Sequence, residues 1–126
     1  GVFVFSEEEG FPFELSYAIE SQWIKAGEGQ TLDVKFDTLP TGTYAVAVVH
    51  DDNGDRQVER NRQDFPKEGV GFSNNQEITL IIPRFHQCAF PLSAEKKRIV
   101  INLDYTEKMI EYKVTGGILI EIEPDR

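Results

Sequence analysis

The stretch LDVKFDTLPTGTYAVAVV, from Leu32 to Val49, decides the fold class of this chain. Its first five residues alternate between apolar and charged side chains, which is typical of a strand with one face buried. A proline and a glycine then indicate a turn, because proline fixes φ and glycine leaves it free. The run from Tyr44 to Val49 is apolar at every position, and such a run predicts a strand buried on both faces.

The rest of the chain contains further strand patterns. Alternation recurs in residues 98–105 and in residues 118–124, where the isoleucines face inward, and residues 77–82 predict another strand that Pro83 ends. Residues 17–27 fit either a helical face or an irregular strand. Because many short strands are separated by glycine, proline and asparagine turns, the sequence predicts an all-β sandwich.

Composition bounds the class of protein. The 126 residues suffice for one domain, and 40% hydrophobic with 28% charged residues is a globular composition. The net charge of -9 argues against nucleic acid or an anionic membrane as partner. That charge fits cation binding, and equally fits solubility alone. No apolar run approaches the ~20 residues that a membrane span needs.

The N-terminus and the cysteine content bear on the compartment. Cys88 is the only cysteine, so no intrachain disulfide forms and the compartment stays open. The chain begins with the strand-like residues GVFVF and shows no signal peptide. We expect leader sequence, and with it part of the domain, to be missing ahead of Gly1.

A long segment with little periodicity separates the strand ending at Val49 from residues 77–82. A connection of this length is usually functional, disordered or held by an interaction. It opens with HDDNGDRQVERN, residues 50–61, in which oxygen-bearing side chains occupy every second position. These candidate Ca²⁺ ligands are Asp51, Asn53, Asp55, Gln57 and Glu59, with Gln57 contributing its backbone carbonyl.

A calcium loop needs hard oxygen ligands at alternate positions, but the match is incomplete. Arg56 stands where an EF-hand loop has its turn glycine, and Arg62 stands where it has a bidentate acid. A full EF-hand is therefore excluded, whereas an Asp-x-Asn-x-Asp loop on a β scaffold stays open. The alternative is a self-satisfied turn, because Asn53-Gly54 is a common turn dipeptide.

The remaining chemistry-bearing residues do not form a recognised catalytic or zinc site. His50 is expected to be a strand-end histidine, hydrogen-bonded to the following loop, on the same face as Val48. The alternating spacing of His86 and Cys88 would point both side chains one way, yet two ligands are too few for zinc. Cys88 is expected to be a buried, inert thiol.

Motifs of common enzyme classes are absent from the sequence. It has no nucleophile elbow, phosphate-cradling glycine loop, His-Glu-x-x-His helix or Cys-x-x-Cys pair. A hydrolase using His50 with Asp51 or Glu68 lacks a nucleophile beside the histidine. We therefore predict that the protein is not an enzyme.

The motifs LPTGTYA, HDDNG, PKEGVGFSNN and the later AF strand occur in order, and this combination resembles the bacterial family called domain of unknown function 2141. The resemblance covers residues 1–105. It implies an exported protein, periplasmic or on the cell surface. It also implies an immunoglobulin-like or prealbumin-like antiparallel β-sandwich, here with one long ordered loop, and no assigned activity.

The family motif maps onto particular residues of the long loop. Its first part falls on Asp51, Asn53, Asp55 and Glu59 of the candidate calcium loop. In its second part, Gly69 and Gly71 would permit unusual φ values. Lys67 and Glu68 could form ion pairs with the acidic loop. The remaining mapped positions are His50, Gly54, Pro66, Lys67, Glu68, Gly69, Gly71, Phe72, Ser73, Asn74 and Asn75.

Residues 106–126 extend beyond the family's usual end within what we predict to be one domain, 1–126. We hypothesise that residues 117–123 complete the sheet edge that a missing N-terminal strand would occupy. An exposed edge there would invite a homodimer.

The predicted function is a non-enzymatic binding or structural module with a protein or polymer partner that the sequence does not name. A Ca²⁺ ion in the 51–59 loop would stabilise the loop. The alternative is a carbohydrate- or polymer-binding domain that uses Trp23 as a stacking platform, which requires Trp23 on the surface.

Overall fold

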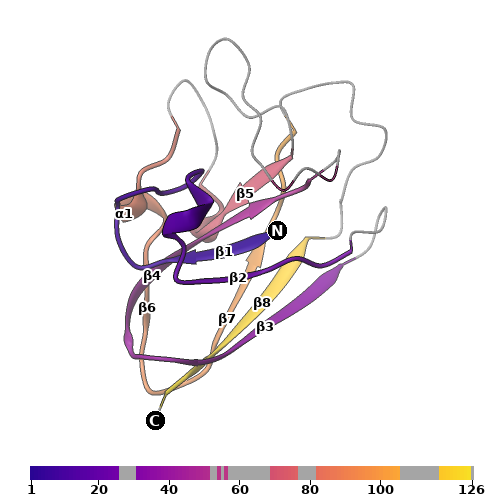
Figure 1. Ribbon diagram of the computed structural model, residues 1–126. Helices are drawn as coiled ribbons and strands as arrows, with labels where there is room; N and C mark the ends of the chain where they lie inside the picture. Colours follow the sequence, from indigo (N-terminus) through magenta and orange to yellow (C-terminus); the bar gives the residue numbers. More distant parts are fainter. Residues whose placement is uncertain are drawn as a thin grey trace.

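The computed structural model describes residues 1–25, 31–51, 54, 56, 69–76, 82–105 and 117–125. In these residues the chain is mostly β and forms two sheets in a sandwich-like arrangement with little helix (Figure 1). The strand predicted over residues 77–82 lies outside the described residues apart from Ile82.

The first sheet has five strands and is centred on β4 (Gly42–Val49). Its order is β2 (Glu20–Gln22), β1 (Val2–Phe5), β4 and β5 (Val70–Phe72), and β6 (Phe90–Leu92) pairs with the first residues of β4. All of these pairings are antiparallel. The central position explains why β4 is buried throughout its apolar run, which confirms that prediction.

The second sheet has three strands, in the order β3 (Leu32–Leu39), β8 (Ile118–Pro124) and β7 (Lys97–Ile101). β8 is antiparallel to β7 but parallel to β3, so the prediction of a wholly antiparallel sandwich is wrong. Residues 117–123 pair with the early strand β3, as the hypothesis required, but β8 lies at the centre of this sheet and not at its edge. β8 lies between two strands of its own chain, so its backbone hydrogen-bonding groups are already paired on both sides.

The main core lies between the two sheets. Successive side chains of a strand point to opposite faces, so Val46 and Val48 of β4 face the second sheet. The isoleucines of β8 meet them from the other side and are at most 2% exposed, as their alternation predicts. This aliphatic layer holds the two sheets together.

A second core covers the other face of the five-stranded sheet. Residues 6–18 and the short helix α1 (Phe85–Cys88) lie on this side in Figure 1. Phe11 packs edge-on against Phe5 and Phe85, with ring centroids 5.3 and 5.9 Å apart. Because it is covered on both faces, this sheet tolerates the continuous apolar runs of β1 and β4.

Two short segments depart from simple strand patterns. The segment 17–27, which fitted either a helical face or an irregular strand, starts at the last residue of the 3-10 turn η1 (Leu15–Tyr17). It then contains the short strand β2. The expected alternation of His86 and Cys88 is wrong, because both lie in α1, where His86 is exposed and Cys88 is buried. Burial, reinforced by the Glu8 charge, raises the pKa of the Cys88 thiol to about 12. This agrees with the predicted inert thiol.

Candidate functional site

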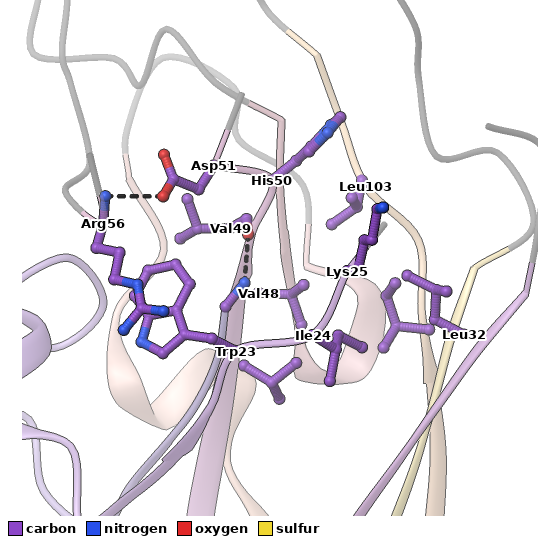
Figure 2. Close-up of a pocket in the computed structure, with 13 residues that line it drawn as sticks. Trp23, Ile24, Lys25, Leu32, Val48, Val49, His50, Asp51, Arg56 and Leu103 are labelled. Atoms are coloured by element: carbon purple, nitrogen blue, oxygen red, sulfur yellow. Dashed lines mark hydrogen bonds between the residues drawn. The ribbon is translucent and has the colours of Figure 1, made fainter. Parts of the chain in front are cut away.

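A pocket of about 400 Å³ opens at the end of the molecule where β1, β3 and β8 begin and β2 and β4 end (Figure 2). One side of it is aliphatic and the other is polar with one aromatic ring. The aliphatic side is formed by Ile24, Leu32, Val48, Leu103 and Ile118, and the polar side by Trp23, His50, Asp51 and Arg56.

His50 continues β4 into this pocket. Its backbone nitrogen donates to the carbonyl of Gly69, 2.8 Å away, just before β5. Its ring is hydrogen-bonded to Tyr105, with Nδ1 3.0 Å from the phenolic oxygen, and packs edge-on against the tyrosine ring. Tyr105 follows β7, a partner that sequence reasoning missed because it is distant along the chain. At 6% exposure, His50 is a buried polar side chain at the pocket wall.

The turn after His50 is closed by Asp51. The backbone nitrogen of Arg56 donates to Asp51 Oδ2 over 2.7 Å. Arg56 is the sixth residue counted from Asp51, and its φ is 57°, in the left-handed region. An EF-hand loop has glycine at that position for the sharp turn. Arg56 thus makes the turn despite its side chain, at a cost of about 1–2 kcal/mol.

The other oxygen of Asp51 is the unusual atom of the site. Oδ1 is buried and has no hydrogen-bond partner. It is the only such side-chain oxygen or nitrogen in the part of the chain that the structure describes. Burying a carboxylate oxygen without a partner is unfavourable, since the oxygen loses its water. A cation or a strong donor at Oδ1 would remove that penalty, so Asp51 fits the first position of a metal loop.

The structure does not describe the other four predicted calcium ligands. Asn53, Asp55, Gln57 and Glu59 lie outside the described residues. The motif residues Pro66, Lys67 and Glu68, and the predicted ion pairs of the last two, lie outside them as well. Within the described ranges, no three His, Cys, Asp or Glu side chains gather in a way that could hold a metal ion.

The glycines of the second motif are needed for space. Neither Gly69 nor Gly71 has a positive φ, so the expectation of unusual φ values at these residues is wrong. A Cβ on Gly69 would collide with the Tyr105 ring, and one on Gly71 would lie 2.5 Å from the carbonyl oxygen of Asn102. Both glycines therefore let the segment after β7 approach β5 closely.

Ser73 ties the second motif to β4 and α1. Its hydroxyl accepts a hydrogen bond from the Val46 nitrogen at 2.9 Å and donates one to the Cys88 carbonyl at 2.5 Å. The next residue, Asn74, donates to the Ala89 carbonyl at 3.0 Å. The serine is fully buried, so its hydroxyl replaces water for two backbone groups.

Asn75 connects the same turn to the second sheet. Its side-chain amide donates to the Val100 carbonyl and accepts from the Asn102 nitrogen, each over 3.0 Å. These are the bonds that a neighbouring strand would make with the edge of β7. Asn74 and Asn75 both have positive φ, which asparagine tolerates better than most residues. The Ser-Asn-Asn part of the motif is therefore structural.

Trp23 forms part of the pocket wall and is half-buried. One edge contact joins it to Phe3, with ring centroids 5.3 Å apart. The Arg56 guanidinium lies 5.2 Å from the ring centroid, a cation–π distance, as Figure 2 shows. Sequence reasoning singled out Trp23 but missed Lys25 and the aliphatic side, because no local motif marks residues contributed by separate segments.

Comparisons with known proteins give one positive result. No curated protein and no solved structure matches the chain. In the described residues no helix is long and apolar enough to cross a membrane. The model of a family described as an uncharacterized protein conserved in bacteria (DUF2141) matches residues 1–100 of the 126, in agreement with the motifs above. The chain belongs to this bacterial family.

Proposed function

We propose that this chain is a non-enzymatic, exported binding module whose 51–59 loop is stabilised by Ca²⁺. The observation that carries the calcium proposal is the Asp51 carboxylate, which has one oxygen fixed by Arg56 and the other buried without a partner. The two-sheet arrangement would then be a variant of the immunoglobulin-like or prealbumin-like sandwich, with one parallel strand pair.

The loop geometry supports calcium as the ion. Ca²⁺ takes six to eight oxygen ligands, and the sequence offers them at alternate positions after Asp51. The left-handed turn at Arg56 supplies the bend that such a loop needs at its sixth position. With a net charge of -9, the chain also gains from binding a divalent cation.

The non-enzymatic role is supported by His50. Its side chain is almost completely buried and hydrogen-bonded to Tyr105, so it is poorly placed to take a proton from a substrate. The family resemblance described above supports the proposed exported location, periplasmic or on the cell surface. The ion would stabilise the pocket wall.

Calorimetric unfolding tests the calcium proposal. We expect excess Ca²⁺ to raise Tm by about 10 °C over EDTA when the ion is at a hundredfold its dissociation constant, because it binds only the folded state. Asp51→Ala should abolish the shift. Asp33→Ala, an exposed aspartate on β3, is the matched control and should retain it. Equal Tm values for the wild type in EDTA and Ca²⁺ would contradict the proposal.

A carbohydrate- or polymer-binding domain is the second candidate, favoured by the place of Trp23 in the pocket wall. A sugar ring stacking on this face would have to displace the Arg56 guanidinium. Titration of the tryptophan fluorescence with neutral oligosaccharides tests it. A saturable fluorescence change would support this candidate, provided that calorimetric titration also detects binding to the wild type and none to Trp23→Phe. Titrations without any change would rule it out for those sugars.

A further inference from the structure

We infer that the pocket binds a small aliphatic carboxylate, with its alkyl part against the aliphatic side and its carboxylate on Lys25. The inference rests on the proposed binding role, for which it names the ligand class, and it is independent of calcium. It follows from the shape of the pocket, the chemistry of its walls and the distribution of charge.

The walls of the aliphatic side come from both sheets. Val48 at the end of β4 faces Ile118 at the start of β8, and Leu32 begins β3. These side chains continue the main core outward, so the pocket extends the apolar layer between the sheets. A volume of about 400 Å³ lies near the lower end of the range for small-molecule sites. An alkyl group of modest length gains the most from such walls, because its burial removes apolar surface from water.

Lys25 provides the charge at this side. Figure 2 shows its side chain next to Ile24, on the side of the pocket opposite Arg56 and the Trp23 ring. Lys35, in contrast, pairs with Glu121 on the outer face of the second sheet, at 3.6 Å. Lys25 forms no ion pair with any residue that the structure describes. Within the described part of the chain, a ligand anion would therefore displace no carboxylate from its ammonium group.

The charge of the pocket differs in sign from that of the whole chain. Among the side chains that line it, those of Lys25 and Arg56 are positive and that of Asp51 is negative. The chain as a whole carries -9. Acidic surface elsewhere repels an anion, so a positive site of this kind selects a ligand with one anionic group. An ammonium-bearing ligand would face repulsion from Lys25, and an alcohol would leave the lysine without a counter-ion.

Octanoate is a suitable probe, because it combines an alkyl chain with a single carboxylate. Binding is measured by calorimetric titration and by the fluorescence of Trp23, the only tryptophan, which lies in the pocket wall. The comparison ligands are 1-octanol and octylammonium. All titrations are run in EDTA and again with Ca²⁺, below the micelle concentration of each ligand.

We expect the wild type to bind octanoate about tenfold or more tightly than 1-octanol, the gain expected from one charge-assisted hydrogen bond. Lys25→Met should reduce octanoate affinity to the level of the alcohol. Lys35→Met is the matched control and should leave it unchanged. Ile24→Phe, which narrows the aliphatic side, should weaken octanoate and octanol together.

Three results would overturn the inference: no octanoate binding by the wild type, equal octanoate affinity for the Lys25→Met and Lys35→Met variants, or preference for octylammonium. The circular dichroism spectrum and Tm of each variant show whether it is folded. If octanoate fails while Ca²⁺ still raises Tm, the ligand class is wrong and the calcium proposal stands. If octanoate binds and Ca²⁺ does not change Tm, the carboxylate inference stands and the calcium proposal is wrong.

Discussion

The Ser73–Asn75 turn and the Asp51–Arg56 turn both lie in the part of the chain that the family model matches, and both contain residues with positive φ. They differ in how their polar side chains are satisfied. The Ser73 hydroxyl both accepts and donates a hydrogen bond to buried backbone, whereas one oxygen of Asp51 is buried without a partner. Because native proteins rarely leave buried polar atoms unpaired, the first turn fits a structural role, and the second supports the proposed Ca²⁺ site. Turns that share a left-handed backbone conformation thus need not share a role.

Removal of the Ser73 hydroxyl should give the largest loss of stability. Ser73→Ala leaves the Val46 nitrogen and the Cys88 carbonyl without their partner in a fully buried place. We expect a loss of about 3 kcal/mol in the free energy of unfolding, measured with urea. Ser93→Ala, at an exposed serine, should change it by less than about 0.5 kcal/mol. Similar losses for both variants would contradict the structural role of Ser73.

A side chain at Gly71 should be the next most damaging change. In Gly71→Ala the new Cβ would lie 2.5 Å from the Asn102 carbonyl oxygen, and backbone cannot move aside easily. The expected loss is about 2 kcal/mol. Gly54→Ala is the comparison in the other turn, where φ is 74° but nothing lies within 4 Å. It should cost about 1 kcal/mol, from backbone conformation alone. The reverse order in urea unfolding would contradict the close packing at Gly71.

The smallest expected effect is the most informative about Asp51. Asp51→Asn keeps an oxygen for the Arg56 nitrogen and removes the unpaired charge, so in EDTA the variant should be more stable by about 0.5–1 kcal/mol. In Ca²⁺ it should be less stable than the wild type, because an amide is a weaker calcium ligand than a carboxylate. Unfolding in urea under both conditions measures this change of sign. A variant less stable than the wild type in EDTA would show that the Asp51 charge is already compensated without the ion.

Local pattern was enough to predict much of the fold. The apolar run of β4 required burial on both faces, and the isoleucines of β8 required one buried face. Both follow from the two-residue period of a strand, which depends only on neighbours in sequence. The ordered motifs likewise led to the family. Local pattern could not show that residues 117–123 pair with both β3 and β7, since strand pairing depends on segments far apart in the chain.

The same distinction applies to the site. The order of residues is enough to show that Asp51 begins a run of oxygen-bearing side chains, and that Arg56 stands at the glycine position of a calcium loop. The three-dimensional fold was needed to show that Arg56 adopts the left-handed turn, that Asp51 keeps one buried oxygen unpaired, and that Lys25 lies beside an aliphatic pocket. The physical reason is that backbone conformation at a turn and the burial of an oxygen are imposed by packing between distant segments. The residue types alone are compatible with either a self-satisfied turn or an ion-binding loop.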